Sequence, residues 1–494
     1  MRPARLFLSV ALLLAPATTL AQPVPLLTAA ARQRGVERGL LPRVAVPGET
    51  PATIEDRMRH YHVPGVSIAV INDGRVEWAR GYGVTEFGGR TRVDTTTLFQ
   101  AGSISKPVAA MGALALVEQG RLALDEDVNA RLTSWKVPAS DLTGERRVTL
   151  RGLLSHSAGL TVHGFPGYVA GTSLPTLVQV LNGVAPANTA PVRVDVAPGT
   201  IWRYSGGGIT VMQLLMEDVT GEPFPAFMQR TVLGPLGMAH STFAQPLPPS
   251  YATRAASGHE RLDTPVPGRF HAYPEMAAAG LWTTPSDLAR WAIEVQRAYR
   301  GESSGVLSPR MTREMLTTQF GAWGLGVQLA GAGDSAMFLH GGRDEGFVAD
   351  LRAFVHRGQG VVIMTNGVNG RLLAELARSV ALAYGWPIPA RPARTIARLD
   401  GASLGALAGT YVLALGRDTT RLRVTREGGR LFLQQSGGTG IRGELLPEGG
   451  LSFFDADDGT GFRFVLDSAA ASPTAASVTI VQGTRTFTAP RAPR

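Results

Sequence analysis

The order of strand-like and helix-like segments constrains the fold of this chain more than any single motif. A strand, a turn and a second strand come first, at 67–71, 72–74 and 76–79, and the turn tripeptide Asn-Asp-Gly is typical of a β-hairpin. Helical patterns then fill the middle of the chain, and strand-like runs return before residue 366. This order predicts an α+β domain, an antiparallel sheet flanked by helices and closed by both chain ends, with an all-helical region inserted. The expected helices are 53–60, 108–128, 150–155, 211–219 and 285–299, and the expected later strands are 323–329, 337–340, 347–355 and 360–365.

A proline-rich segment at 387–392 separates this domain from a different kind of sequence. Beyond it, short β-type runs broken by glycine-containing turns predict an all-β module. We therefore expect a main domain over 46–386, a linker over 387–398 and a barrel-like domain over 399–494. Residues 22–45 are expected to form an N-terminal segment without clear partners.

Residues 1–21 have the pattern of a secretory signal peptide. Arg2 and Arg5 precede the apolar run 6–15, and the small residue Ala21 marks the expected cleavage site. The apolar run is short for a bilayer span, and no other uninterrupted stretch of about 18 apolar residues occurs. We expect an exported protein, periplasmic or secreted, without a transmembrane segment in the mature chain; an uncleaved anchor is the alternative.

Composition and charge argue against several classes of function. The absence of cysteine excludes disulfides, zinc thiolates and cysteine nucleophiles. The formal charge of +9 is spread along 494 residues without a basic block, so no nucleic-acid partner is predicted. The histidines lack metal-ligand spacing and the glycine-rich stretches lack the phosphate-loop pattern, so neither a metal nor another cofactor is expected. The oligomeric state does not follow from the sequence.

The chain has only two lysines, and one of them follows a serine by three residues, a spacing that allows the two side chains to react together. The lysines are Lys106 and Lys136, and the other 46 of the 48 basic residues are arginines. An arginine stays charged, whereas a lysine amine in a desolvated pocket can take a proton from a hydroxyl. Ser103 precedes Lys106 by three residues at the start of a predicted helix, so both side chains lie on one face. A capping serine and a surface lysine are the structural alternative for this pattern alone.

Two further motifs place polar side chains at the ends of predicted elements. Tyr204 lies on a loop that enters the helix 211–219, and a tyrosine there can relay a proton. His340 ends a strand and is followed by two glycines, which let a substrate approach the sheet edge while the imidazole faces a cleft. A lone tyrosine or histidine is more often structural, so the argument depends on the three motifs together.

Taken together, Ser103-x-x-Lys106, Tyr204-Ser205-Gly206 and His340-Gly341-Gly342 resemble the serine β-lactamase and penicillin-binding-protein superfamily. The resemblance is closest to the class C β-lactamase branch, which includes D,D-carboxypeptidases, D-aminopeptidases and family VIII carboxylesterases. It covers residues 50–385 and implies a β-lactamase/transpeptidase-like fold, while the C-terminal module is similar to the lipocalin-like domain of some peptidases in this family. The supporting segments are 153–160, 219–221, 233–238 and 280–289.

The resemblance also implies a role for each motif residue. Ser103 would attack a carbonyl and form an acyl-enzyme, with Lys106 and Tyr204 sharing the transfer of its proton and water completing the turnover. His340 takes the place of a lysine found in many β-lactamases and would recognise a substrate carboxylate or pass a proton. The residues expected to hold the oxyanion or the substrate are Ser103, Ser205, Gly206, Gly341, Gly342 and Arg343.

One position departs from the family pattern, because Gly206 stands where the second motif usually carries an asparagine. An ester has no N–H to satisfy, so the loss of this amide clamp weakens peptide and β-lactam recognition more than ester hydrolysis. The sequence therefore predicts an exported serine hydrolase that acts on an ester or a D-amino-acid-containing peptide or amide. The alternatives are a class C-type β-lactamase or D,D-carboxypeptidase, and a non-hydrolytic penicillin-binding or sensor protein. The expected partner is a small ester, peptide or β-lactam.

Overall fold

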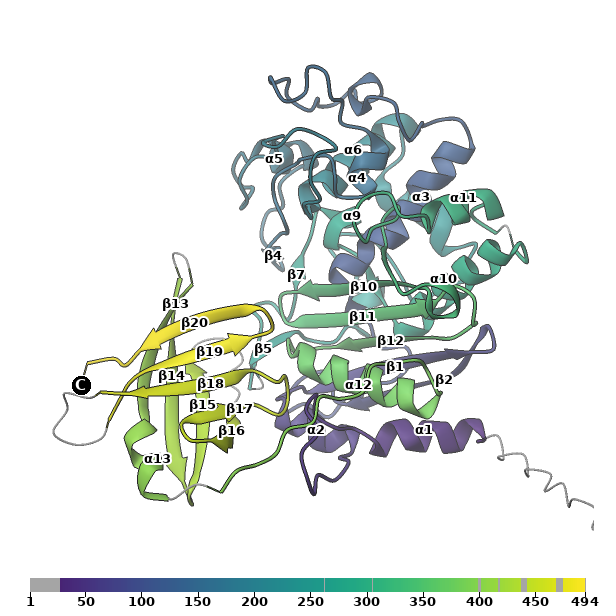
Figure 1. Cartoon of the computed structure of the whole chain (residues 1–494). Coiled ribbons are helices and arrows are strands. Elements are labelled where there is room, and N and C mark those ends of the chain that lie inside the picture. Colours follow the sequence, from purple (N-terminus) through teal and green to yellow (C-terminus); the bar gives the residue numbers. More distant parts are fainter. Residues whose placement is uncertain are drawn as a thin grey trace, which may run out of the picture.

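The computed structural model describes residues 27–261, 263–303, 305–398, 401–415, 418–436, 442–467 and 474–493. The predicted signal peptide, residues 1–21, lies outside the described residues. Within them, a larger body carries helices above and below a sheet, and a smaller β-barrel stands beside it (Figure 1). None of the helices in this described part is long and apolar enough to span a bilayer.

The larger body is built on a six-stranded antiparallel sheet with the order β2-β1-β12-β11-β10-β9. Because β1 pairs with β12, the two ends of the domain meet in the middle of the sheet, as the sequence predicts. The predicted hairpin is present, and Asp73 and Gly74 form its turn with φ angles of 51° and 67°. The strands are β1 (Gly65–Asn72), β2 (Arg75–Gly83), β9 (Gln328–Ala330), β10 (Met337–Asp344), β11 (Phe347–Phe354) and β12 (Gly360–Thr365).

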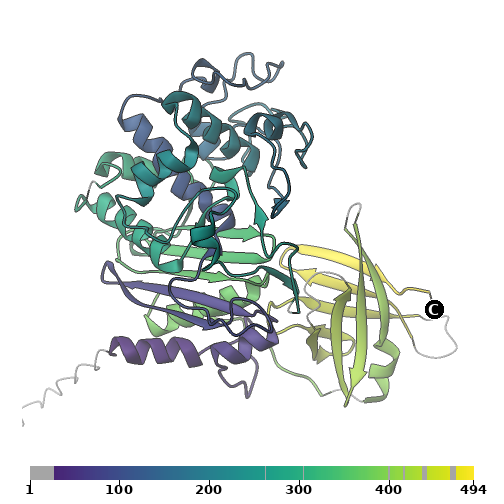
Figure 2. The ribbon, with the colours of Figure 1, turned by 180° about the vertical axis from the view of Figure 1, so that it is seen from behind.

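Helices cover both faces of the sheet. Alternate residues of β1 point to opposite sides, so Val66 and Ile68 pack with one layer of helices and Ala69 and Ile71 with the other. The first layer holds α1 (Ala29–Arg38), α2 (Ile54–His60) and α12 (Gly370–Ala383), and the second holds α3 (Ser105–Glu118) and α10 (Pro285–Arg300) (Figures 1 and 2).

The N-terminal segment is part of this packing, which differs from the expectation that residues 22–45 lack partners. Val36 of α1 and the following Leu40 are fully buried in the core that α12 shares. The sequence did not indicate this packing, because arginine and alanine dominate the exposed side of the segment. The domain boundary expected at residue 46 is therefore not a packing boundary.

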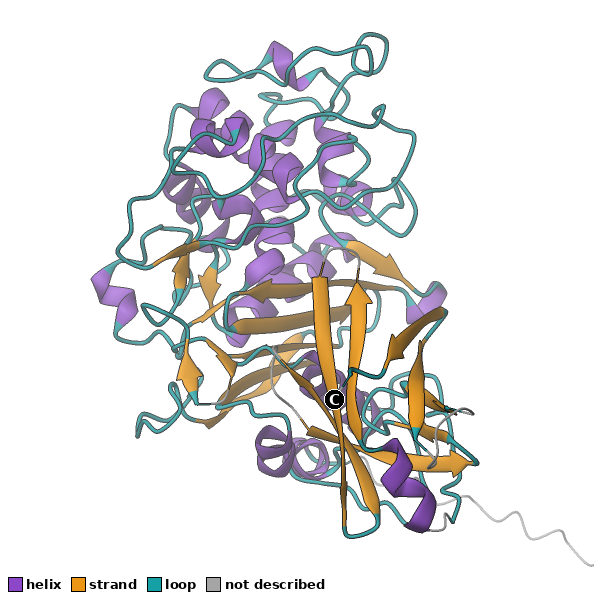
Figure 3. Ribbon diagram, turned by 90° about the vertical axis from the view of Figure 1, so that its left-hand side faces the viewer, coloured by secondary structure: helices purple, strands orange, loops and turns teal. Residues whose placement is uncertain are grey.

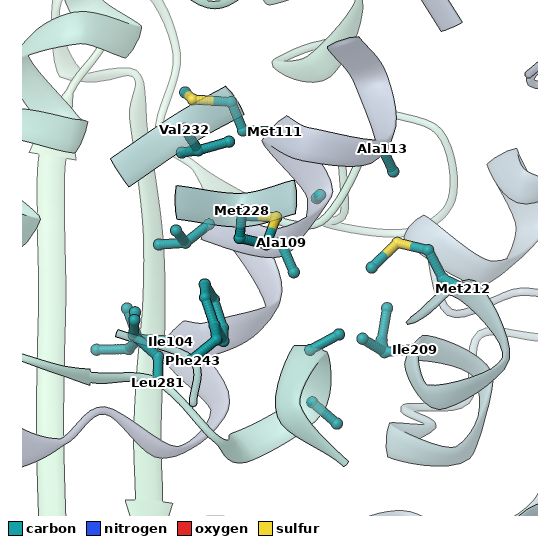
Figure 4. Close-up of a cluster of buried hydrophobic side chains, with 14 of the residues drawn as sticks. Ile104, Ala109, Met111, Ala113, Ile209, Met212, Met228, Val232, Phe243 and Leu281 are labelled. Carbon is teal, nitrogen blue, oxygen red and sulfur yellow. The ribbon is translucent and has the colours of Figure 1, made fainter. Parts of the chain in front are cut away.

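The inserted helical region gathers on one side of the sheet (Figure 3). Its centre is α3, which is apolar on nearly all sides and buried along most of its length. Ala109 and Ala113 are small enough to let Met212 and Met228 of neighbouring helices pack close to α3 (Figure 4). This dense core fixes the N-terminal end of α3, where Ser103 lies. The other helices include α4 (Leu150–Leu154), α5 (Leu177–Asn182), α6 (Gly206–Thr220), α7 (Phe224–Met228), α8 (Pro249–Ala252), α9 (Met276–Ala279) and α11 (Pro309–Met315).

The smaller body is an antiparallel sheet in which each strand pairs with the next along the chain. A bridge between Tyr411 and Arg491 joins its first and last strands, so the sheet is a nearly closed barrel and confirms the predicted all-β module. A helix that the sequence analysis missed, α13 (Gly401–Leu407), precedes the barrel, and its Leu404 and Leu407 pack in the barrel core. The strands are β13 (Gly409–Leu415), β14 (Asp418–Glu427), β15 (Arg430–Ser436), β16 (Arg442–Gly449), β17 (Ser452–Phe454), β18 (Gly461–Leu466), β19 (Ala475–Gln482) and β20 (Arg485–Pro490).

Ion pairs hold the barrel against the α2 and α12 side of the larger body. The Arg57 guanidinium of α2 donates to Glu375 of α12 and, at 2.7 Å, to Asp457 of the barrel. Arg371 of α12 donates to Asp455 at 2.9 Å and to Asp458 at 2.5 Å. The two bodies are therefore fastened through charged groups that are largely removed from water.

Candidate active site

Ser103 and Lys106 meet at the start of α3. A 3₁₀ turn over Gly102–Ile104 leads into the helix and places Ser103 one turn before Lys106. The Lys106 side chain is buried, with 2% of the residue exposed, and its Nζ donates to Ser103 Oγ at 2.9 Å and to the Ala278 carbonyl of α9 at 2.7 Å. The contact expected from the sequence spacing is therefore made. Lys136, by contrast, donates to the carbonyls of Asn129 and Leu132 in a loop.

The second motif approaches this pair from the beginning of α6. The Tyr204 ring centre lies 5.0 Å from Lys106 Nζ. Ser205 caps α6: its hydroxyl accepts from the Gly208 N–H at 2.9 Å and donates to the Thr161 carbonyl at 2.8 Å. The Ser205 hydroxyl is thus engaged in holding the loop that carries Tyr204, which differs from the substrate contact expected for it.

His340 of β10 faces the same space, with its ring centre 6.2 Å from that of Tyr204. Its Nδ1 donates to the Gly341 carbonyl at 2.6 Å, which leaves Nε2 as a buried acceptor. Burial, and after it the electrostatic effect of Lys106, lower the pKa of His340 to about 3, so the imidazole is neutral at physiological pH. A neutral ring does not attract a carboxylate by charge. The neutral state of His340 therefore favours the proton-passing role over the carboxylate recognition that the sequence also allowed.

Two glycines let β10 lie directly against the turn that carries Ser103. A Cβ built at Gly342 would fall 1.9 Å from the Ala101 carbonyl oxygen, and one at Gly102 would fall 2.5 Å from the Arg343 nitrogen. The backbones of the two segments are therefore in contact, which places main-chain amides of β10 beside Ser103. The strand continues through the glycines to Asp344, although the sequence pattern had predicted its end at His340.

Sequence reasoning missed the role of His156, which lies behind Tyr204. Its Nδ1 accepts the Ser205 N–H at 3.2 Å, and its ring centre lies 4.2 Å from that of Tyr204 and 4.7 Å from that of Trp323. Burial, together with the charge of Lys106, lowers the pKa of His156 well below its ordinary value. His156 also adopts a φ of 58°, which is rare for a residue with a Cβ and typical of a constrained position. The only sequence signal was its place in the family-like segment 153–160.

Two buried carboxyl groups lie in the electrostatic environment of the site without any signal in the sequence. Asp344 of β10 and Glu275 before α9 are buried, and among the described residues their carboxyl oxygens have no hydrogen-bond partner. Burial raises the pKa of Asp344 well above its usual range, against the opposing effect of Lys106. Burial likewise raises the pKa of Glu275 to about 7. Neither position could be predicted from the sequence, because the residues that surround each carboxyl group come from distant parts of the chain.

Ser103, Tyr204 and His340 line one open cleft of about 540 Å³, and Trp202 and Trp323 form its aromatic wall. Gly341, Gly342 and Arg343 line the same cleft, as expected for substrate-binding positions. At Gly206 an added Cβ would meet the His163 carbonyl and the Phe165 ring at 3.0 Å each, so a loop crowds the position where the family pattern carries an asparagine. Within the described ranges, no group of three or more histidine or carboxylate side chains is placed to hold a metal ion.

A model of the family described as Beta-lactamase matches residues 51–385. The chain belongs to the β-lactamase family. Among its relatives are esterase EstB of Burkholderia gladioli, 28% identical over 67% of this chain and 93% of that protein, and the unguisins hydrolase ungD of Aspergillus violaceofuscus. The fungal protein is 26% identical over 68% of this chain, and the match spans only 60% of its own length.

Solved structures show the same fold as this β-lactamase-family chain. The octameric penicillin-binding protein homologue from Pyrococcus abyssi superposes with a TM-score of 0.58 at 21% identity, covering 88% of this chain and 98% of that one. SurE superposes with a TM-score of 0.53 at 24% identity over 89% and 97% of the two chains. These structural matches confirm the predicted fold. The family match and the relatives named esterase and hydrolase confirm the predicted superfamily and, at the level of the family, the predicted class of β-lactamase-related serine hydrolases.

Proposed function

We propose that this chain is an exported serine hydrolase that forms an acyl-enzyme on Ser103 and hydrolyses esters in preference to D-amino-acid-containing amides. The observation that carries the proposal is the buried contact of 2.9 Å between Lys106 Nζ and Ser103 Oγ, at the foot of a cleft that Tyr204 also lines. A nucleophile, a proton acceptor and a proton relay are thus held together by the core around α3. Export rests on the signal-peptide pattern of residues 1–21.

In the first half-reaction Ser103 Oγ attacks the substrate carbonyl and its proton passes to the Lys106 and Tyr204 pair. The carbonyl oxygen becomes an oxyanion that accepts hydrogen bonds from the main-chain N–H groups of Ser103 and Arg343. The proton then goes to the leaving alcohol or amine as its bond to the carbonyl carbon breaks. In the second half-reaction water adds to the acyl carbon and gives one proton to the same pair. The bond between the acyl carbon and Ser103 Oγ then breaks, Oγ takes the proton back from the pair, and the acid leaves.

The preference for esters rests on Gly206 and His340. Gly206 has no side chain to pair with a substrate amide, and the loop at His163 and Phe165 lies close to the position that its Cβ would take. The neutral state of His340 removes the fixed positive charge that a lysine at this position would offer to a substrate carboxylate. An uncharged ester needs neither group. The name of the Burkholderia relative, an esterase, agrees with this direction.

The test compares the mature protein with three variants on p-nitrophenyl butyrate, D-alanine p-nitroanilide and nitrocefin, with a fluorophosphonate probe as a label. Ser103→Ala and Lys106→Arg should lose labelling and turnover, because one removes the nucleophile and the other installs a group that stays protonated. Lys136→Arg is the matched control and should behave as the wild type. Adducts on the wild type that persist in Ser103→Ala, or faster turnover of nitrocefin than of the ester, would contradict the proposal.

A further inference from the structure

A second cavity lies between the two bodies of the molecule, at some distance from Ser103. It has a volume of about 510 Å³, which falls in the range of about 300–1,000 Å³ common for small-molecule sites. Its walls come from β10 and β11, α12, the linker after Trp386 and the barrel loop at Asp457 and Asp458. Most of the side chains facing it are apolar, and they include Met337, Phe354, Ala377, Trp386 and Ile388.

Arginines gather at this cavity in excess of the acids that neutralise them. Arg371 is held by two barrel aspartates, and Arg352 is paired with Asp350 at 2.7 Å. Arg378 and Arg43 also line the cavity, and within the described residues neither has a carboxylate partner. Burial, followed by the charges of Arg391, Arg43 and Arg352, lowers the pKa of Arg378. An anion in this corner would relieve the mutual repulsion of the guanidinium groups and accept their hydrogen bonds.

The cavity adjoins the cleft that Ser103 lines. Arg352, Gly370 and Ala374 line both spaces. Gly341 lines the cleft, and its lack of a side chain leaves open space there: a Cβ built at Gly341 would meet only the Ala349 carbonyl, at 3.9 Å. An alternating strand places Gly341 on the α12 side of β10, opposite Asp350.

The distance between the two spaces follows from the strand register. Gly342 touches the Ser103 turn, Leu339 pairs with Arg352, and Met337 pairs with Phe354 inside the cavity. At about 3.4 Å per residue, the path along β10 is about 10 Å to Arg352 and about 17 Å to Phe354. A long extended chain attached at Ser103 can cover this path.

We propose that the cleft and the interdomain cavity form one extended site for an amphiphilic ester whose apolar chain crosses Gly341 and ends in an anion held by Arg378 and Arg43. The distal group is a carboxylate or a phosphate. The inference rests on the proposed function, since the ester carbonyl must be at Ser103 for the chain to lie this way. It also gives the barrel a role, because Asp457 and Asp458 belong to the wall of the cavity.

The test measures kcat/KM for p-nitrophenyl butyrate, p-nitrophenyl dodecanoate and the p-nitrophenyl half-esters of succinic, suberic and dodecanedioic acids, using the full mature chain. The dodecanedioic half-ester should exceed the succinic half-ester and the uncharged dodecanoate by about tenfold, the usual scale of one charge-assisted hydrogen bond. The double variant Arg43→Gln/Arg378→Gln should abolish this selectivity. Arg310→Gln, an exposed arginine of α11 outside both spaces, is the matched control and should keep it.

Binding without turnover separates this inference from the proposed function. Calorimetric titration of the Ser103→Ala protein with dodecanedioic acid and with dodecyl phosphate tests the arginine corner directly and shows which anion it prefers. Binding of neither anion, or binding unchanged in the double arginine variant, would overturn the extended site even if butyrate is hydrolysed. Absence of Ser103-dependent butyrate hydrolysis with arginine-dependent binding intact would instead overturn the proposed function and leave the cavity as a separate anion site.

Discussion

The contact between β10 and the Ser103 turn can be tested with one substitution made at two adjacent positions. Gly342→Ala places a methyl group 1.9 Å from the Ala101 carbonyl oxygen, whereas Gly341→Ala places it 3.9 Å from its nearest neighbour. Neither glycine has a positive φ, so alanine fits the backbone conformation at both positions. The two variants therefore differ in the close contact and in little else.

The size of the effect follows from the overlap. A Cβ and a carbonyl oxygen rarely approach within 3.0 Å, so Gly342→Ala must push β10 and the Ser103 turn apart by about 1 Å. A displacement of about 1 Å between a nucleophile and the groups that hold its oxyanion costs about 10²-fold in rate. Overpacking of this kind also costs about 1–3 kcal/mol of folding free energy. Gly341→Ala should stay within about 0.5 kcal/mol of wild-type stability.

The assay is kcat/KM for p-nitrophenyl butyrate, paired with urea unfolding to verify that each variant is folded at the assay temperature. We expect Gly342→Ala to lose about 10²-fold in kcat/KM and Gly341→Ala at least tenfold less than that. The same loss in both variants would show that the added methyl groups act on the substrate and not on the backbone contact. A folded Gly342→Ala protein with nearly wild-type kcat/KM would refute the positioning argument.

Three further predictions concern buried polar groups. Because burial raises the pKa of Glu275 to about 7, the folded protein retains a proton that the unfolded chain loses above pH 4.5. The free energy of unfolding should therefore fall by about 3 kcal/mol between pH 4.5 and pH 7. Urea unfolding of Glu275→Gln at the two pH values should lack this decrease. Asp457→Asn removes one partner of the interdomain Arg57 guanidinium, which keeps its bonds to Glu375, and should cost about 1.5–3 kcal/mol of folding free energy. Calorimetry should show separate unfolding of the barrel, and a single unshifted transition would contradict this prediction. His156→Phe leaves the Ser205 N–H without an acceptor and should lower kcat/KM about tenfold in a folded protein, whereas unchanged kinetics would show that this hydrogen bond does not position Tyr204.

The sequence predicted the parts of the fold and site that depend on local patterns. The Asn-Asp-Gly turn and the apolar runs around it predicted the first hairpin, because turn chemistry and strand alternation act over a few residues. The spacing of Ser103 and Lys106 predicted their contact, because a helical turn brings residues three apart together. A local pattern also sets the start of α10, where the Thr284 side chain caps the helix by accepting from the Asp287 N–H.

The parts that were not predicted depend on burial by distant segments. The neutral state of His340 follows from its enclosure by Lys106 and the surrounding core, and no neighbouring residue in the sequence indicates that enclosure. The packing of α1 was not predicted for the same reason, because its few apolar residues contact α12, which lies more than three hundred residues later in the chain. Gly206 was recognised as a departure from the family pattern, but the crowding of this position by the loop at His163 and Phe165 could be seen only in three dimensions.

The position of α12 links the chemistry at Ser103 to the barrel. One side of this helix packs on the sheet whose strand β10 touches the Ser103 turn, and its charged residues Glu375 and Arg371 meet the barrel loop through Arg57 and three aspartates. Substrate parts that extend beyond Gly341 therefore reach a wall made jointly by both bodies. Short esters should depend on the core around α3 alone, whereas long anionic esters should also depend on the docking of the barrel. Asp457→Asn should accordingly lower kcat/KM for the dodecanedioic half-ester more than for butyrate, and an equal loss on both substrates would separate the barrel from substrate binding.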